Sequence, residues 1–282
     1  MQLSLMTLQI AILRCLLVSA AFLSGTQFAF AEDGCGGQAA AIIQRAYPDA
    51  VKTSETGFSF NNLAITLPAE SASDDPHAMI CRIWPAHPEV MLVAVPLIGA
   101  QSNDGNEGDL ELLVLDAASL DVRQRLYLAG RMADDAVRIT KIAFDTARYR
   151  LARQQMAFGL RIFQHGSSGL NPFGEVGLSL YTIANGKLVS VLAGITVSDN
   201  HGEWDTNCAG TFDETSRTLS MQSTAHNGYA DILVSETSST TVASVAANGE
   251  CVEKRDGPKE STMRLTYNGR EYAVPDDLKS LD

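Results

Sequence analysis

From residue 91 onwards, apolar residues come in short continuous runs or at every second position, and turn sequences separate these segments. Residues 91–98 form a continuous apolar run, whereas the apolar residues at positions 156, 158, 160 and 162 alternate with polar or small neighbours. A period of two places side chains on one face of a β-strand. We therefore expect a mostly β protein built as an antiparallel meander. Pro96 should place the end of its strand near a sheet edge or a bulge.

Asn-Gly pairs support this arrangement because they favour tight turns. Asn185-Gly186 lies between the apolar segments 178–183 and 188–192, and Asn268-Gly269 repeats the pattern near the C-terminus. Asn and Gly accept the positive φ angles that a two-residue hairpin turn requires. The pattern does not decide between a sandwich-like body and a propeller-like one.

Two further features leave alternatives open. Segments 110–151 and 178–219 share six identical residues when aligned at a shift of 68, and an internal repeat would make each a meander of about four strands. Residues 235–244 are rich in Ser and Thr. They fit either a long edge strand or a loop.

One short helix is expected near the start of the mature chain. Apolar residues at positions 39, 42, 43, 46 and 47 fall on one helical face, and Pro48 follows them. This spacing predicts an amphipathic helix, and the proline ends it.

The first 31 residues have the features of a cleavable signal peptide. Arg14 is their only charged residue, and an apolar run from Cys15 to Gly25 follows it. Ala29-Phe30-Ala31 matches the small-x-small cleavage pattern, and two acidic residues come next. We expect residues 32–282 to form a single β-rich exported domain that is periplasmic or secreted. The long apolar stretch before Arg14 leaves an uncleaved membrane anchor as the alternative.

Cleavage would leave four cysteines, Cys35, Cys81, Cys208 and Cys251. Four cysteines allow three pairings. Because they fall into two well-separated pairs, we expect the disulfides Cys35–Cys81 and Cys208–Cys251, each closing a loop of about 45 residues and stabilising the fold by about 3–4 kcal/mol. No two cysteines lie within four residues of each other, so the close pairs of a structural zinc site are missing.

The chain is acidic, with 21 Lys and Arg against 33 Asp and Glu and a formal charge of −12. Cleavage would remove only Arg14 from the charged residues and make the mature chain one charge more negative. Such a surface repels nucleic acid and anionic lipid. We therefore expect no nucleic-acid partner and no stable membrane insertion after signal cleavage.

The segment 199–205 is the leading candidate for chemistry. Asp199, His201, Glu203 and Asp205 are spaced two residues apart, so all four would face the same way in an extended strand. Carboxylates and an imidazole on one face could bind a divalent cation or share a proton. The alternative is a polar loop rich in Asn and Gly.

Two other segments are weaker candidates. Residues 103–109 combine acidic and amide side chains with glycines, as calcium loops do, but lack the ordered ligand spacing of such loops. Residues 165–169, His-Gly-Ser-Ser-Gly, look like a serine loop, but the pattern Gly-x-Ser-x-Gly is not satisfied. We predict no catalytic residue and no cofactor, and we leave a divalent cation open.

Trp84 and Trp204 are the two tryptophans of the chain, and each lies near a cysteine. Tryptophan is a frequent interface anchor, so both are candidate binding residues, although packing over a disulfide is the alternative role. Because no catalytic motif is present, we expect a non-catalytic binding or interaction module of the cell envelope that takes an envelope protein or a small ligand. A hydrolase or metal-dependent enzyme with a site around 199–205 is the alternative function.

Overall fold

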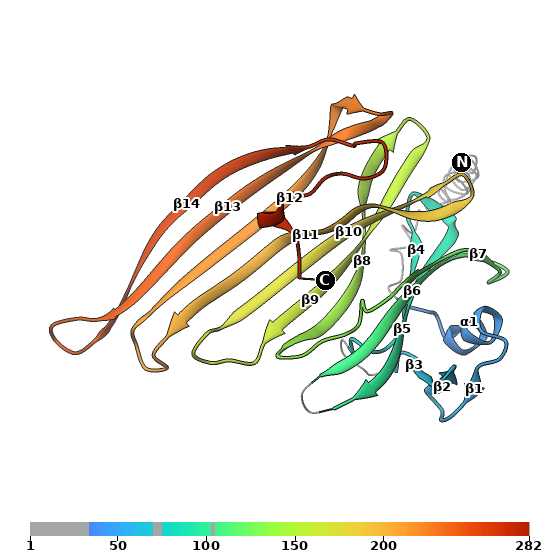
Figure 1. Ribbon diagram of the computed structural model, residues 1–282, viewed down its shortest axis with the longest axis horizontal. Coiled ribbons are helices and arrows are strands. Elements are labelled where there is room, and N and C mark those ends of the chain that lie inside the picture. The colour runs from blue at the N-terminus through green and yellow to red at the C-terminus, as the bar shows by residue number, and fades with distance from the viewer. Residues whose placement is uncertain (1–33, 70–74, 103–104, 282) are drawn as a thin grey trace, which may run out of the picture. The chain divides into compact units, whose positions relative to one another are not determined.

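This computed structural model describes residues 34–69, 75–102 and 105–281, which form two antiparallel sheets and one short α-helix (Figure 1). About 66% of the described residues are in strands, so the expected mostly β, antiparallel fold is confirmed. The chain divides into two units, residues 1–30 and residues 31–282. The first unit and the predicted cleavage position lie outside the described residues. Within the described ranges, no helix is long and apolar enough to cross a membrane.

The first sheet is built from the N-terminal half of the chain. Its strands follow the order β1-β2-β3-β5-β6-β7, and β4 also pairs with β5. Helix α1 (Ala39–Ala46) packs against it and buries the residues that its spacing predicts. The strands are β1 (Val51–Lys52), β2 (Gly57–Phe60), β3 (Leu63–Thr66), β4 (Ile80–Trp84), β5 (His87–Gln101), β6 (Asn106–Asp116) and β7 (Val122–Leu128).

A buried polar cluster ties the end of the helix to this sheet. The Tyr47 hydroxyl donates a hydrogen bond of 2.6 Å to Glu111, which is 7% exposed. Glu111 also accepts two hydrogen bonds from Arg125, at 2.7 and 2.9 Å. Burial and the neighbouring Glu111 carboxylate raise the pKa of Tyr47 well above its usual range. The phenol therefore stays protonated and keeps its role as a donor.

Strand β5 continues past Pro96 to Gln101, and its pairing with β6 shifts register between Ile98 and Gln101, so the irregularity expected near the end of this strand is present. β4 pairs with β5 up to Ala94, and β3 pairs with it at Ile98. On the opposite side of β5, Pro96 is aligned with Leu110 of β6. Pro96 thus lies in the gap between two partner strands, where the N–H that proline lacks is not needed.

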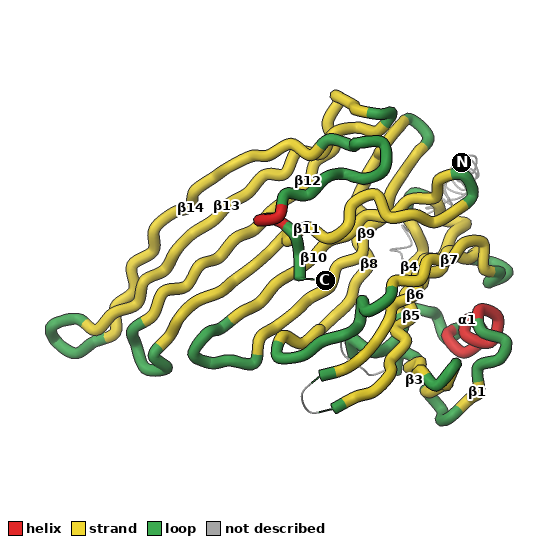
Figure 2. The backbone as a smooth tube through the Cα atoms, viewed as in Figure 1, coloured by secondary structure: helices red, strands yellow, loops and turns green. Residues whose placement is uncertain are grey.

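The second sheet is a meander in which each strand pairs with its neighbour in sequence (Figure 2). Its seven strands are β8 (Val137–Ala152), β9 (Gln155–Gly166), β10 (Phe173–Ala184), β11 (Lys187–Trp204), β12 (Gly210–His226), β13 (Tyr229–Val245) and β14 (Cys251–Leu265). Residues 235–244 lie within β13, between β12 and β14. The segment is therefore an inner strand and neither an edge strand nor a loop.

The turn predictions had different outcomes. Asn185 and Gly186 have φ angles of 51° and 73° and join β10 to β11, which confirms that hairpin. Asn227-Gly228, which we did not single out, joins β12 to β13 in the same way, with φ angles of 48° and 87°. Asn268 accepts hydrogen bonds from two backbone N–H groups of its turn, but only one isolated bridge, Tyr267 with Tyr272, flanks it.

The two segments of the suggested repeat lie in different parts of the fold. Residues 110–151 pass from β6 and β7 of the first sheet into β8 of the second, whereas residues 178–219 cover β10 to β12 of the second sheet alone. The aligned segments are therefore not arranged alike, and duplication stays a prediction from sequence.

The two sheets share a hydrophobic core, which makes the arrangement sandwich-like. Leu92 and Leu112 of the first sheet belong to the same buried cluster as Phe158 and Ile162 of the second. A separate cluster forms where the C-terminal segment, residues 266–281, covers part of the second sheet. There the Tyr272 N–H donates to the Val191 carbonyl of β11 at 2.8 Å. β12 pairs with β11 only from Ser198 onwards, so the C-terminal segment occupies the edge that β12 leaves open.

Both predicted disulfides are confirmed, as Cys35–Cys81 and Cys208–Cys251. The first links the segment before α1 to β4. The second joins the loop between β11 and β12 to the start of β14, and so closes the far end of the second sheet. Each bridge lies within one of the two sheet regions.

Candidate functional site

The fold brings together two segments that the sequence singled out separately, residues 165–169 and residues 199–205. The first leaves the end of β9, and the second ends β11. The loop between β9 and β10 runs along the end of β11, because the Gly202 N–H donates to the Pro172 carbonyl at 3.1 Å and the Trp204 N–H donates to the Leu170 carbonyl at 2.8 Å. The loop thereby extends the pairing of β10 and forms one wall of a cleft.

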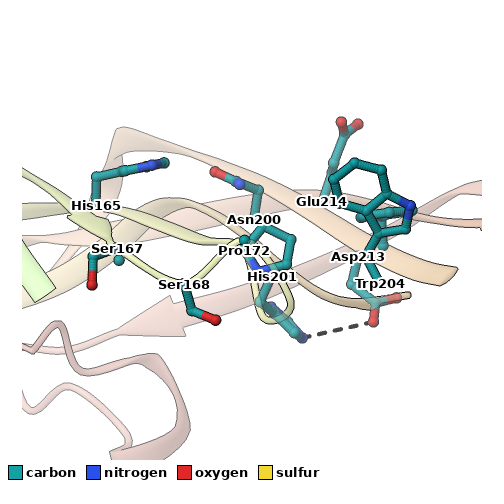
Figure 3. A pocket seen from close by; sticks show the side chains of 12 residues that line it. His165, Ser167, Ser168, Pro172, Asn200, His201, Trp204, Asp213 and Glu214 are labelled. Atoms are coloured by element: carbon teal, nitrogen blue, oxygen red, sulfur yellow. Dashed lines mark ion pairs between the residues drawn. The ribbon is translucent and has the colours of Figure 1, made fainter. Parts of the chain in front are cut away.

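This cleft has a volume of about 580 Å³ and lies at one end of the second sheet (Figure 3). We call it the Trp204 cleft. It is lined by His165, Gly166, Ser167, Ser168, Gly169, Pro172, Asn200, His201, Trp204, Phe212, Asp213 and Glu214. Its size is within the range of small-molecule sites.

The lining side chains divide between the two faces of the sheet. Figure 3 shows His165, Asn200, Trp204 and Glu214 pointing to one side, whereas the imidazole of His201 and the carboxylate of Asp213 point to the other. The register explains this division, because Asn200 is aligned with Glu214 and His201 is aligned with Asp213. Consecutive residues of a strand face opposite ways.

On the Trp204 side, glycines make room for the larger side chains. A Cβ on Gly202 would lie 2.8 Å from Cδ1 of Phe212, and one on Gly210 would lie 3.0 Å from the same ring. The Phe212 ring therefore lies over two glycines. A Cβ on Gly174 would lie 2.5 Å from Oδ1 of Asn200. The surface consequently combines two aromatic rings, of which the Trp204 residue is 37% exposed, with polar groups beside them.

On the opposite side, His201 forms a loose pair with Asp213. The His201 Nε2 lies 3.7 Å from the Asp213 Oδ2, and both side chains are substantially exposed. The other Asp213 oxygen accepts a hydrogen bond of 2.5 Å from Thr240. Ser168 Oγ accepts a hydrogen bond from the Asn171 N–H. Among the described residues, no hydrogen bond joins a serine hydroxyl to His201, so these groups do not form the hydrogen-bonded chain of a serine hydrolase.

The four predicted metal ligands are placed differently from one another. Asp199, His201 and Glu203 alternate along β11, as the sequence predicts for a strand. Asp205 lies beyond the strand and accepts hydrogen bonds from the N–H groups of Asn207 and Cys208, both at 2.8 Å. These backbone donors, Asn207 above all, lower the pKa of Asp205 and fix it in the turn before the disulfide. The described part of the chain contains no group of three or more His, Cys, Asp or Glu arranged to hold a metal ion.

Asp199 has a separate environment from the other candidates. It is aligned with Glu175 of β10 and Thr215 of β12. Its Oδ1 is buried without a hydrogen-bond partner in the structure. Asp199 and Glu175 are thus two neighbouring acidic residues, but a cation would need further ligands.

The two tryptophans differ in accessibility. Trp84 is 2% exposed and packs edge-on against Phe158, with ring centroids 5.3 Å apart. It contributes to the core between the sheets and is not presented to a partner. Trp204 borders the cleft and is partly exposed. Only Trp204 therefore enters the candidate site.

The weaker calcium candidate falls partly outside the described residues, because positions 103 and 104 are not among them. β6 begins at Asn106, whose backbone N–H and side-chain amide both donate to Asp134 Oδ1, at 3.2 and 3.0 Å. This amide therefore joins the start of β6 to the segment before β8.

The structure also shows a histidine–carboxylate pair that the sequence analysis missed, His226 with Asp231. Asp231 has a fully buried side chain, and its Oδ1 lies 2.6 Å from the His226 Nδ1. Its Oδ2 accepts a hydrogen bond of 2.6 Å from Thr224 and lies 3.3 Å from Arg264. Hydrogen bonds, first from Thr224 and then from His226, lower the pKa of Asp231. The Asn227-Gly228 sequence could have revealed this pair, because the hairpin turn that it forms brings residues 226 and 231 close together.

The Asp231 carboxylate orients the imidazole of His226, whose side chain is 54% exposed. Among the described residues, no hydroxyl or thiol is hydrogen-bonded to this ring. Thr224 donates to Asp231 itself and accepts from Arg264 at 2.8 Å. The cluster consequently ties β12, β13 and β14 together.

Comparisons with known proteins gave no family and no relative: no protein-family model, no curated protein and no solved structure matches the chain.

Proposed function

We propose that this protein is an exported, non-catalytic binding module that takes a carbohydrate in the Trp204 cleft. The observation that carries the proposal is the pairing of a partly exposed indole and the Phe212 ring with polar side chains on one face of the sheet. Sugars have the matching chemistry, because their rings present C–H groups on their faces and hydroxyls at their edges.

The aromatic side chains suit the faces of a sugar ring. The face of an aromatic ring carries partial negative charge, and polarised C–H groups are attracted to it. Asn200 supplies both a donor and an acceptor, Glu214 supplies acceptors, and His165 supplies one of each in its neutral form. Such groups match the hydroxyls of a bound sugar.

The scaffold favours binding over catalysis. Among the described residues, the one histidine–carboxylate pair at the cleft is the exposed His201–Asp213 contact of 3.7 Å, and it faces away from Trp204. A triad needs the base within hydrogen-bond reach of both its nucleophile and its orienting carboxylate. Export rests on the sequence pattern of residues 1–31, and the two disulfides favour an oxidising compartment.

Tryptophan fluorescence gives a direct test, because Trp204 and Trp84 are the only tryptophans and Trp84 is buried. Protein purified from its own cells is titrated with uncharged mono- and oligosaccharides, and we expect a saturable change in emission. Trp204→Ala should abolish both the signal and the binding measured by calorimetry. Tyr127→Ala, which removes a 52% exposed aromatic residue on β7, is the matched control and should bind normally. Absence of binding to all of these sugars would reject the proposal.

The hydrolase alternative has one observation in its favour, since His201, Asp213, Ser167 and Ser168 line the same cleft. Its test is sugar-ester and peptide-ester hydrolysis by the purified protein and by His201→Ala. Turnover that disappears in this variant would replace the binding proposal with an enzyme.

A further inference from the structure

We propose that the ligand is a linear chain of uncharged sugar units that lies along β11, with units on both sides of His165 and Asn200. This inference rests on the proposed carbohydrate function and adds the length and the direction of the ligand. It follows from a second cavity next to the Trp204 cleft.

The second cavity has a volume of about 300 Å³ and shares two lining residues, His165 and Asn200, with the Trp204 cleft. We call it the Ser198 cavity. Its other lining residues are Thr140, Phe163, Gln164, Gly174, Glu175, Val176 and Ser198. The shared residues make the two hollows neighbouring parts of one groove.

The boundary between the two cavities is formed by a row of residues across the sheet. Gly174 of β10 is aligned with His165 of β9 and with Asn200 of β11, and Asn200 is aligned with Glu214 of β12. Because residue 174 is a glycine, the Asn200 amide can lie over it, with its Oδ1 2.5 Å from the position that a Cβ would take. The row thus presents the polar side chains of His165, Asn200 and Glu214 along the boundary between the two cavities.

The direction of the groove follows from the positions of its ends on β11. Ser198 lines one cavity and Trp204 lines the other, and both belong to the same alternating set as Asn200 and Gly202. The pairing with β12 is continuous from residue 198 to residue 204. Six residues of extended strand span about 20 Å at roughly 3.3 Å per residue. A single sugar ring would fill only a part of this length.

The charges along the groove favour an uncharged chain. The lining of neither cavity contains a Lys or Arg, and the whole chain carries a formal charge of −12. The carboxylate of Glu214 is paired with Arg255 at 2.8 Å, so this guanidinium is already engaged. A polyanionic glycan would find no free cation in the lining to offset its repulsion from the acidic protein.

The test is a series of β-1,4-linked glucose and N-acetylglucosamine oligomers from one to six units, titrated into the purified protein by calorimetry. We expect affinity to rise at least about tenfold between one and four units and then to level off, because further units extend beyond the groove. Affinity that is equal for every length would overturn the inference while leaving the carbohydrate proposal intact.

Two variants at one position locate the second half of the groove. Ser198→Trp fills the Ser198 cavity at an exposed position, and we expect it to reduce the affinity for the four-unit oligomer about tenfold, to the level of the short sugars, without changing their binding. Ser198→Ala removes the hydroxyl without filling the space and is the matched control, for which we expect a smaller change. An unchanged oligomer affinity in Ser198→Trp would overturn the inference. If the wild-type protein binds none of these sugars, the proposed function itself is rejected.

Discussion

Strands β5 and β14 are both 15 residues long, but their surroundings are opposite. β5 is buried at nine consecutive positions, Val90 to Ile98, because both of its faces are covered. β14 is exposed at every position except Leu265. Burial of apolar side chains therefore stabilises the pairing of β5, whereas cross-strand bonds mainly stabilise the pairing of β14.

The composition of β14 fits its place at the edge of the second sheet. Lys254, Arg255, Pro258 and Lys259 lie along it, and charged residues and proline at an edge oppose pairing with another chain. The exposed end of the sheet is held by the Arg255–Glu214 pair and by the disulfide Cys208–Cys251. Four predictions test whether the two regions are stabilised by these different means.

The largest effect is expected from removing the disulfide of the exposed region. The double variant Cys208→Ser/Cys251→Ser opens a loop with a sequence separation of 43, and loop-closure entropy predicts a loss of about 4 kcal/mol. Urea unfolding measures the loss. Hydrogen exchange should speed up in β13 and β14 while β5 and β6 stay protected. Equal acceleration in both sheets would contradict the separation of the two regions.

A cavity in the buried region should have the next largest effect. Leu92 in β5 is 0% exposed, so Leu92→Ala removes packing on all sides and should cost about 3 kcal/mol in the free energy of unfolding. Val252→Ala in β14 is the matched control, because Val252 is 44% exposed. It should change stability by less than about 0.5 kcal/mol. Similar losses of stability in Leu92→Ala and Val252→Ala would contradict the expected difference between buried β5 and exposed β14.

The polar cluster beneath the helix should contribute less than the apolar core. Glu111→Gln removes the carboxylate that accepts from Tyr47 and Arg125. Because the Arg125 side chain is 46% exposed and can be rehydrated, we expect a cost of about 2 kcal/mol, below that of a fully buried pair. Thermal unfolding checks this value. Asp121→Asn breaks the exposed pair with Arg45 and should cost less than about 0.5 kcal/mol.

The smallest effect concerns acid stability at the His226–Asp231 cluster. The pKa of Asp231 is lowered from its ordinary value of 3.8, chiefly by the hydrogen bond from Thr224. Its carboxylate therefore stabilises the folded state above that value, and the contribution is lost as the pH falls through the lower folded-state pKa. Urea midpoints at pH 6 and pH 3 should differ less in Asp231→Asn than in the wild-type protein. If the urea midpoint changes equally between pH 6 and pH 3 in Asp231→Asn and in the wild-type protein, the Asp231 carboxylate does not contribute to acid stability.

Local sequence signals were reliable where one turn or one helix face decides the conformation. Asn185-Gly186 forms its hairpin because these residues accept positive φ angles. The apolar spacing before Pro48 predicted α1 correctly. Pro96 correctly signalled an irregular end of β5, where the register with β6 shifts between Ile98 and Gln101. The strand nevertheless runs through the proline, because the missing N–H matters only where a partner strand is present. That condition depends on the placement of β3 and β4, which no local pattern contains.

The candidate site was visible in the sequence only as separate parts. Trp204 and the two polar segments were identified, but Phe212 was not, because a Phe next to an Asp resembles any strand residue. Its importance comes from Gly202 and Gly210, which the strand register places beneath its ring. Trp84 and Trp204 also looked alike, since both lie near a cysteine.

The sequence by itself determined the strand-rich class, the helix, the pairing of the four cysteines and the acidic charge. These depend on side-chain period, turn chemistry and spacing, which act over a few residues or on the chain as a whole. Only the tertiary structure decided which tryptophan is exposed, which polar residues share a face, and that two cavities meet at His165 and Asn200. A shift of one residue in register would turn each of these side chains to the opposite face, and register is fixed only when the strands pair.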